Sequence, residues 1–541
     1  GARSIAHLNH AGRMANPKIP GNVYLSSTDR ACENGGAKPS AMTKQDIQEA
    51  VELFARSAKR AVDAGFDMIE LQFGHGYLGA QFLSPFVNDR EDEYGGSAEN
   101  RQRFPLEVLE AVKKAVDVPV IVRISGDEMI PEGFHLEDMI RFSHALENHG
   151  ASAVHVTAGT ACSTPPWFFQ HMFIKKGKTW DFAETIQQHI DIPVIYVGRI
   201  NSRADVEKLK EKYHAEYIAL GRALIADPEF TGKYLGQVDG RIRPCLACSE
   251  GCLGGVKSGQ GLGCVVNPLV GKEDEALAPA DHPKRIAVVG GGIAGMQAAI
   301  TLKERGHDVS ICEKDALGGQ FNLAWLPPNK DSLKEILDYY FYEIKEKEIP
   351  VLKKEATPEK IVSAGYDEVV IATGAVPAVP PVKGLKKYYW AEFLKEENIP
   401  ENENVLVIGG GLIGVEIASK LIDAGSRVTM VEMMDEIAGG MEMIERKFTM
   451  KKLQDNNTQI YLKHKVTEIL EDKDVLIEDE KHQQTVIRNI DKIIIATGMR
   501  SENSLKDELD GCCKTHVIGD AIKPSKARQA IMTAYNTAKS I

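Results

Sequence analysis

The sequence lacks the features of a membrane protein and of a nucleic-acid-binding protein. No uninterrupted apolar run reaches the roughly 20 residues that a membrane-spanning helix needs. Acidic residues outnumber basic residues by 77 to 65, which gives a formal net charge of -12 at pH 7. This charge offers no basic surface to nucleic acid and is repelled by anionic lipid. We therefore expect a protein of ordinary soluble composition that acts on a small molecule.

Cysteine is also scarce, with nine residues in the chain, and the spacing is not that of a disulfide framework. This scarcity fits a reducing cytoplasm. Four cysteines stand close together, at Cys245, Cys248, Cys252 and Cys264. A second CxxC pair, usual in a zinc ribbon, is missing here, whereas three close thiolates and one distant thiolate suit an iron-sulfur cluster. We expect a 4Fe-4S cluster, with zinc and a disulfide or free thiols as alternatives.

The first 240 residues alternate short β-branched runs with amphipathic helical stretches, a pattern typical of βα units and a parallel sheet. Six strands are predicted, at 4–8, 68–72, 120–125, 153–157, 194–198 and 217–221, with helices at 43–64 and 98–116 among the segments between them. A closed (β/α)₈ TIM barrel has eight strands, and this sequence starts with glycine and enters a strand at once. We predict an α/β fold in which residues 1–240 form a TIM barrel whose first two βα units are missing. An open doubly wound sheet is the alternative.

Two Gly-Arg pairs follow the last two predicted strands, Gly198-Arg199 and Gly221-Arg222. Barrels often bind phosphate with the loops after strands seven and eight, where backbone N-H groups and an arginine meet the dianion. Either pair alone is a weak signal, but two at consecutive strand ends predict a phosphorylated cofactor such as FMN.

The second half carries two dinucleotide-binding fingerprints after a cysteine loop and linker at 241–282. Each has the full context of a strand, GxGxxG, a helix and an acidic residue about 20 positions on. The first consists of Gly290, Gly292, Gly295 and Glu313, and the second of Gly409, Gly411, Gly414 and Glu432. The glycines let backbone approach a pyrophosphate at a helix N-terminus, and the acid can accept from a ribose hydroxyl. Because Glu432 would repel a 2′-phosphate, NADH is favoured over NADPH.

Several ordered motifs in the first half resemble the Old Yellow Enzyme family of flavin-dependent ene-reductases. They are His10-Ala-Gly-Arg13, the segment from Glu70 through Gln72 and His75 to Tyr77, Val122-Arg123-Ile-Ser125 and Gly221-Arg222. With the cysteine loop and the second half, nearly the whole chain resembles the subgroup of 2,4-dienoyl-CoA reductase, 2-enoate reductase, the bile-acid flavoproteins and trimethylamine dehydrogenase.

The resemblance assigns roles to individual residues. It implies that Tyr77 protonates the substrate carbon next to the carbonyl, while the flavin delivers hydride to the carbon beyond it. His75 and Gln72 match the pair that bonds the substrate carbonyl or the flavin, although Gln72 replaces the usual histidine. Arg123 matches the arginine near the flavin N1 and C2 carbonyl, and His7 stands where a flavin-contacting glutamine is common. The aromatic stretch 165–169 either lines the pocket or packs as an ordinary loop.

The second half resembles flavoproteins with two dinucleotide domains. Ala-Thr-Gly motifs ending at Gly374 and Gly498 are typical connections, and Gly319-Gln320 and Gly519-Asp520 resemble FAD contacts. We therefore predict an FAD domain at 283–398 and 505–541, with an NAD(P)H domain inserted at 399–504. A disulfide reductase would place a CxxC pair in these domains, and the sequence has none there.

Together these features predict an enzyme that passes electrons from NADH through FAD and a 4Fe-4S cluster to FMN. Reduced FMN then reduces an activated C=C bond of an enoate, an enone or a dienoyl-CoA. The alternatives are amine oxidation of the trimethylamine dehydrogenase type, desaturation of a keto-steroid or bile acid, and an electron-transfer partner without its own substrate. We expect no nucleic-acid or membrane partner, and the resemblance implies a homo-oligomer.

Overall fold

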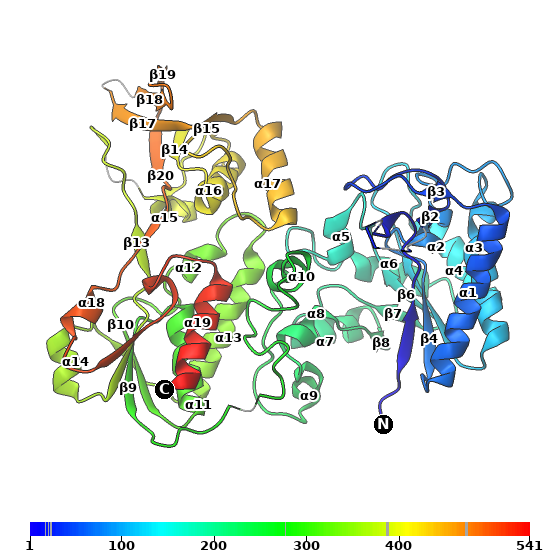
Figure 1. Ribbon diagram of the computed structural model, residues 1–541, viewed down its shortest axis with the longest axis horizontal. Coiled ribbons are helices and arrows are strands. Elements are labelled where there is room, and N and C mark those ends of the chain that lie inside the picture. Colours follow the sequence, from blue (N-terminus) through cyan, green and yellow to red (C-terminus); the bar gives the residue numbers. More distant parts are fainter. Residues whose placement is uncertain (17, 20, 22–23, 276, 386–388, 471–473) are drawn as a thin grey trace. The chain divides into compact units, whose positions relative to one another are not determined.

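The computed structural model describes residues 1–541 except 17, 20, 22–23, 276, 386–388 and 471–473 (Figure 1). The chain divides into two compact units, Gly1–Ala223 and Leu224–Ile541. Within the described ranges, no helix combines the length and the apolar character that crossing a bilayer requires.

The first unit is built on a six-stranded parallel sheet. Its strands are β1 (Ile5–Leu8), β4 (Met68–Gln72), β5 (Val120–Ser125), β6 (Ala153–Thr157), β7 (Val194–Tyr196) and β8 (Tyr217–Ile218). The spatial order is β1-β4-β5-β6-β7-β8, so each strand lies beside the one before it. A doubly wound sheet reverses direction at a switch point, whereas a barrel does not. The barrel prediction is therefore confirmed over the doubly wound alternative.

Helices cover the outer face of this sheet, and α1, α3 and α4 lie side by side in Figure 1. The helices of this unit are α1 (Lys44–Asp63), α2 (Leu78–Leu83), α3 (Ala98–Ala115), α4 (Leu136–Asn148), α5 (Pro165–Phe169), α6 (Lys178–Gln187), α7 (Arg203–Lys212) and α8 (Arg222–Ala226), the last of which crosses into the second unit. Local sequence explains α1, because Thr43 caps its N-terminus in a reciprocal bond with Asp46, and Ile47, Phe54 and Ala58 form its buried face. A short pair, β2 (Leu25–Ser26) and β3 (Ser40–Ala41), precedes it.

One pair of cysteines in this unit is joined, and the sequence did not predict it. Cys32 and Cys162 form a disulfide across 130 residues of sequence. The spacing of the cysteines gave no sign of it, because the pairing depends on where two distant loops meet.

The second unit begins with α9 (Phe230–Leu235) and the cysteine loop, which includes the π-helical turn η2 (Glu250–Gly254) and α10 (Gly255–Lys257). A five-stranded parallel sheet follows, in the order β11-β10-β9-β12-β22. Its strands are β9 (Arg285–Val289), β10 (Asp308–Glu313), β11 (Val351–Lys353), β12 (Glu368–Ile371) and β22 (Lys514–Val517). Helices α11 (Ile293–Glu304), α13 (Lys334–Glu346) and α19 (Ala527–Ser540) pack together beside it, and α14 (Pro358–Ala364) precedes β12. We call this the first nucleotide domain.

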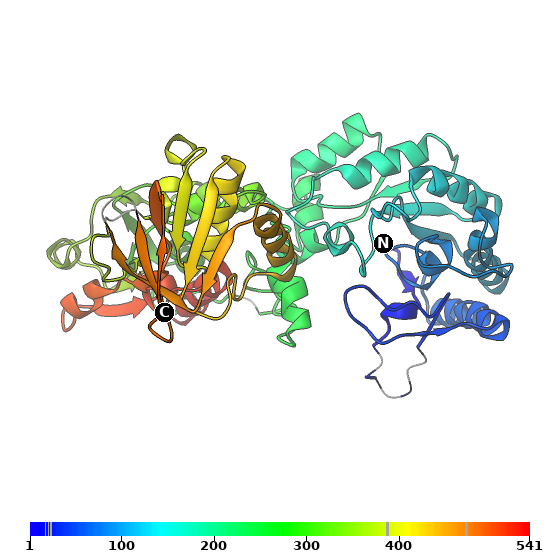
Figure 2. The same cartoon turned by 90° about the horizontal axis from the view of Figure 1, so that it is seen from above.

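The second nucleotide domain repeats the pattern with a parallel sheet in the order β16-β15-β14-β20. Figure 2 shows its yellow and orange strands side by side. The elements are β14 (Asn404–Ile408), α16 (Leu412–Asp423), β15 (Arg427–Glu432), α17 (Met443–Asp455), β16 (Gln459–Leu462) and β20 (Lys492–Ile495), with an antiparallel sheet of β17 (His464–Ile469), β18 (Val475–Asp479) and β19 (Gln484–Ile487). Strands β13 (Ala375–Pro377) and β21 (Met499–Ser501) pair antiparallel where the chain leaves and re-enters the first nucleotide domain. Shorter helices are α12 (Phe321–Ala324), α15 (Trp390–Phe393) and α18 (Ser504–Glu508).

Candidate functional site

Gln72 ends β4, and His75 and Tyr77 lie on the turn that leads from it to α2. The backbone of His75 has φ of 63°, an uncommon value for a non-glycine residue, and it is held there because its N-H donates to Ser125 Oγ at 2.8 Å. The buried ring places Nε2 2.8 Å from Thr157 Oγ1, and Nδ1 3.5 Å from Gln72 Nε2. The turn is therefore fixed by hydroxyl groups from β5 and β6. Ser125 ends the motif Val122-Arg123-Ile-Ser125, whereas no sequence motif identified Thr157.

The two titratable groups of this turn have opposite pKa shifts with one shared cause. Burial lowers the pKa of His75 well below its usual value, so the ring is neutral near pH 7. Burial raises the pKa of Tyr77 above 10, although nearby Arg123 opposes the shift. The Tyr77 phenol therefore keeps its proton at neutral pH, as a general acid must.

Aromatic side chains of α5 pack against this turn. The Phe168 ring lies edge-on to His75 with 4.5 Å between ring centroids, and 6.4 Å from the Tyr77 ring. Phe168 thus lies against the turn, and whether this stretch lines a substrate pocket stays a prediction. The segment is close-packed, because a Cβ on Gly159 would lie 2.5 Å from Trp167 Cβ.

Polar side chains on the neighbouring strands β1, β4, β5 and β6 contact one another next to this turn. Glu70 on β4 lies 2.5 Å from His7 Nδ1 and 2.7 Å from His155 Nδ1. Arg123 on β5 is in register with both Gln72 and His155, and its buried Nε has no hydrogen-bond partner among the described residues. A buried donor without a partner fits a site that receives an acceptor group from a ligand. Glu70 begins one of the sequence motifs but received no role there, and His155 was missed, because only the fold brings these strands together.

Both Gly-Arg pairs lie where the sequence predicts, at the carboxyl ends of β7 and β8. Gly198 has φ of 114°, and a Cβ there would lie 2.5 Å from Thr179 Oγ1, so only glycine fits. Arg199 donates to the carbonyl of Ile174 at 2.7 Å, and Arg222 donates to that of Gln170 at 2.8 Å. Gly221 has open space at its Cβ position, so backbone there is open to a ligand. Two guanidinium groups and this turn suit a phosphate group.

Three of the four loop cysteines, Cys245, Cys248 and Cys264, pack with one hydrophobic core of the first nucleotide domain. None of the four is in a disulfide in the described part of the chain. Over the same residues, no three or more His, Cys, Asp or Glu side chains have the geometry of a site for one metal ion. Four thiolates are a donor set that iron-sulfur clusters use, so these cysteines fit the predicted 4Fe-4S cluster, which stays a prediction.

In the first nucleotide domain the predicted glycines form one continuous turn. A Cβ on Gly295 would lie 1.9 Å from the carbonyl oxygen of Gly290, so helix and strand meet without side chains. Glu313 accepts a 2.6 Å hydrogen bond from Gly291 N, and its carboxylate retains further acceptor positions for ribose hydroxyls. Gly319 packs against Gly292, the neighbouring Gly318 donates to Gly291 O at 2.8 Å, and Gln320 donates to Ala375 O at 2.6 Å.

The second nucleotide domain repeats the close contacts of this turn. A Cβ on Gly414 would again lie 1.9 Å from a carbonyl oxygen, here that of Gly409, while Gly411 is open. Glu432 accepts from Gly410 N at 2.5 Å, as Glu313 does from Gly291. Two equivalent turns on two parallel sheets fit two dinucleotides.

The remaining predicted residues lie at the strand crossings between these domains. Gly374 and Gly498 both have positive φ and flank the β13-β21 pair. Gly519 N donates to Thr533 Oγ1 at 3.0 Å, and Asp520 O accepts from Ser501 Oγ at 2.9 Å. Burial raises the pKa of Asp520 above its ordinary value.

Comparisons with known proteins match both halves of the chain. A model of the NADH:flavin oxidoreductase / NADH oxidase family matches residues 8–238, and a pyridine nucleotide-disulphide oxidoreductase model matches residues 284–518. An NADH oxidase of Thermoanaerobacter brockii is 37% identical, with 100% of this chain and 85% of that protein covered. A cinnamate reductase of Clostridium sporogenes is 32% identical with the same coverage. The structure of a 2-naphthoyl-CoA reductase with 2-naphthoyl-CoA is similar with a TM-score of 0.92 and 27% identity, covering 100% of this chain and 85% of that one.

Proposed function

Because the chain belongs to the NADH:flavin oxidoreductase / NADH oxidase family, we propose that it uses NADH to reduce an activated C=C bond. The substrate class is an enoate, an enone or a dienoyl-CoA. A cinnamate reductase and a 2-naphthoyl-CoA reductase among the similar proteins support this class. In cinnamate, the double bond is conjugated to a carboxyl group, so addition of hydride to one carbon makes the other basic.

The observation that carries the proposal is the protonated Tyr77 phenol on the His75 turn, against Phe168. A phenol at this place can donate its proton to the carbon that becomes basic. Bound FMN would supply the hydride. The neutral, buried His75 ring fixes the turn that presents Tyr77, and Phe168 limits the access of water from its side.

The proposed cofactor sites follow from the donor groups. Arg123, Arg199 and Arg222, with the turns at Gly198 and Gly221, would hold FMN, and the four loop cysteines would hold a 4Fe-4S cluster. The turn at Gly290 would hold FAD, and the turn at Gly409 would hold NADH. We infer an electron path from NADH through FAD and the cluster to FMN, in which the cluster carries electrons singly.

The test is turnover by full-length protein purified without oxygen, after FMN, FAD, iron and acid-labile sulfide per chain have been measured. NADH is mixed with cinnamate, an enone steroid or a dienoyl-CoA, and products are identified by mass spectrometry. We expect a product with one C=C bond fewer, and equimolar NADH oxidation, with at least one of these substrates. Oxidation of trimethylamine by the same protein, with every alkene unchanged, would overturn the proposal.

A further inference from the structure

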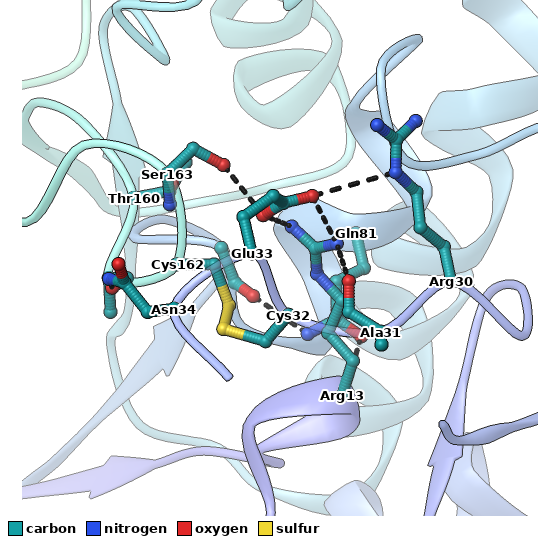
Figure 3. The surroundings of a disulfide bond; sticks show 12 residues. Arg13, Arg30, Ala31, Cys32, Glu33, Asn34, Gln81, Thr160, Cys162 and Ser163 are labelled. Carbon is teal, nitrogen blue, oxygen red and sulfur yellow. Dashed lines mark hydrogen bonds and ion pairs between the residues drawn. A yellow bond between two sulfur atoms is a disulfide. The ribbon is translucent and has the colours of Figure 1, made fainter. Parts of the chain in front are cut away.

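The Cys32–Cys162 disulfide joins two loops of the first unit. One is the loop between β2 and β3, whose tip carries Cys32, and the other is the segment between β6 and α5, which carries Cys162. Figure 3 shows the sulfur bridge between them. Cys162 is 1% exposed, whereas Cys32 is only half-buried, so a reagent from solution meets the Cys32 sulfur first.

The base of the first loop is closed without help from the disulfide. Ser40 N donates to Tyr24 O at 2.9 Å, and the Tyr24 hydroxyl donates to Ala37 O at 2.7 Å. Ser27 and Thr28 are buried and donate from their hydroxyls to carbonyls of the α2 region. The tip at 32–34 therefore extends from a fixed base.

Three consecutive tip residues contact three consecutive residues of the second segment. Beside the disulfide, Glu33 accepts from Ser163 Oγ at 2.8 Å. Asn34 Nδ2 donates to Ala161 O at 3.0 Å. The disulfide is thus the covalent centre of a small interface that also includes these two polar contacts.

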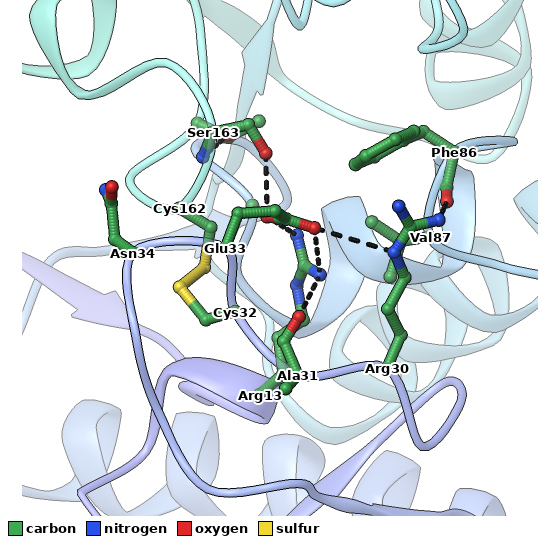
Figure 4. A network of polar contacts seen from close by, with 12 residues as sticks. Arg13, Arg30, Ala31, Cys32, Glu33, Asn34, Phe86, Val87, Cys162 and Ser163 are labelled. Atoms are coloured by element: carbon green, nitrogen blue, oxygen red, sulfur yellow. Dashed lines mark hydrogen bonds and ion pairs between the residues drawn. A yellow bond between two sulfur atoms is a disulfide. The ribbon is translucent and has the colours of Figure 1, made fainter.

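Glu33 is itself anchored by arginine. Arg13, only 1% exposed, donates to both Glu33 carboxylate oxygens at 3.1 Å, and Arg30 Nε lies 3.5 Å from the same carboxylate, as Figure 4 shows. Arg30 also stacks on the Phe86 ring at 3.8 Å. The tip residues next to Cys32 therefore keep a defined position, which favours re-formation of the disulfide after reduction.

The second segment continues directly into the candidate site. Ala161 N donates to His75 O at 3.0 Å, and Thr160 lies against Gly76. A few residues further on, Phe168 packs on His75 and Tyr77. A contact that holds Cys162 in place therefore also holds the segment that packs against Tyr77, the proposed acid.

We propose that Cys32 and Cys162 form a thiol-disulfide switch that controls the substrate site. The oxidised pair fixes the segment 158–169 against the His75 turn, and reduction leaves that segment held by non-covalent contacts alone. Only the assay on substrate turnover rests on the proposed function.

The chemistry is thiol-disulfide exchange with a dithiol. A thiolate of the dithiol attacks Cys32 Sγ and forms a mixed disulfide, and Cys162 leaves as a thiolate that takes up a proton. The second thiol of the reagent then forms the reagent's own disulfide and releases Cys32. The protein gains two electrons and two protons, and the dithiol loses the same.

The first experiment maps the thiols of the full-length protein purified without reductant. One sample is alkylated directly, and another after treatment with dithiothreitol. In the first sample we expect a linked peptide pair that contains Cys32 and Cys162. In the second sample we expect both of these cysteines to be alkylated. Cys512 should be alkylated in both samples. Alkylation of both Cys32 and Cys162 without dithiothreitol, even after incubation with oxidised glutathione, would overturn the proposal.

The second experiment measures the consequence by hydrogen-deuterium exchange and steady-state kinetics. Dithiothreitol should speed exchange at 158–169 and raise the KM for the alkene about tenfold through lost positioning. The Cys32→Ala/Cys162→Ala variant should have the exchange rate and KM of the reduced protein, and dithiothreitol should not change them. In the Cys512→Ser/Cys513→Ser variant, dithiothreitol should change both quantities as it does in the parent. Equal exchange in both redox states would overturn the switch. If no alkene is reduced, the proposed function fails, but the exchange measurement still decides the switch.

Discussion

Lys330 donates a hydrogen bond to Glu416 at 2.6 Å and so joins the two nucleotide domains. Lys330 lies in the first domain, and Glu416 lies on α16, which starts at the second glycine turn. The same ammonium group lies 2.5 Å from Glu445 on α17, and both side chains are 9% exposed. This buried group of charges fixes one domain against the other at the helix that would receive NADH.

Replacing Lys330 with methionine should therefore strongly destabilise the protein, because it leaves the buried Glu445 and the half-buried Glu416 without their cation. We expect a loss of about 3 to 5 kcal/mol in the apparent free energy of unfolding. Reduction of flavin by NADH should slow about tenfold as the domains lose their fixed orientation. Denaturant unfolding and rapid-mixing absorbance measure the two effects.

Lys451→Met is the matched control, because Lys451 lies on α17 but pairs with Asp455 at the surface, where its side chain is 71% exposed. Its stability should stay within about 0.5 kcal/mol of the parent. Equal effects of the two substitutions would contradict the role given to Lys330.

Tyr77→Phe removes the proposed acid and little else. We expect kcat for alkene reduction to fall about 100-fold or more, with flavin reduction by NADH unchanged. Tyr94→Phe is the control, since the Tyr94 hydroxyl donates to Glu107 at 3.1 Å and takes no part in the His75 turn. If Tyr77→Phe reduced the alkene at the parental rate, Tyr77 would be excluded as the acid.

Local sequence was enough to predict much of the scaffold. Strands β4, β5 and β6 begin and end at the predicted residues, because β-branched runs bounded by polar turns define them. Strand β7 ends two residues earlier than predicted, because Thr179 and Trp180 bind the carbonyls of Val197 and Gly198 and the backbone of Gly198 turns away.

Contacts that join distant strands and loops could not be predicted in this way. Glu70 lies between histidines of β1 and β6, and Cys32 pairs with Cys162. The first contact depends on which strands are neighbours in the sheet, and the second depends on which loops come together. Spacing along the chain carries no such information, whereas the glycine turns are encoded within a few residues.

Glu368 gives the first nucleotide domain a defined acid sensitivity. It lies on β12 and accepts from Lys284 at 2.6 Å, with His516 Nε2 of β22 also 2.6 Å away. Burial alone would raise its pKa, but these partners lower it to about 2, below the ordinary 4.5. A lowered pKa stabilises the fold fully above pH 4.5, and this contribution is lost as the pH falls toward 2.

Glu368→Gln should therefore destabilise the protein by about 2 kcal/mol at pH 7. The difference from the parent should shrink steadily between pH 4.5 and pH 2. Thermal unfolding at a series of pH values measures this, with Glu508→Gln on exposed α18 as the control. A difference that stays constant over that interval would contradict the assignment.

A substitution at Gly251 tests the cysteine loop without replacing a cysteine. A Cβ at this position would lie 2.9 Å from both Cα and the carbonyl carbon of Cys264, and this backbone has no flexible end that can move away. Gly251→Ala should therefore separate Cys264 from the other three cysteines. We expect iron and acid-labile sulfide per chain to fall to a small fraction of the parental content, and alkene reduction to fall with them.

Gly254→Ala is the matched control on the same turn, because its Cβ would meet only Ser249 O at 3.6 Å, an ordinary contact. Its iron content should stay near that of the parent. Since the turns at Gly290 and Gly409 are separate from this contact, both variants should still oxidise NADH with a small artificial acceptor. Parental iron in Gly251→Ala would mean that the loop holds no cluster in this geometry, whereas loss of NADH oxidation would mean that the nucleotide domains need the loop to fold.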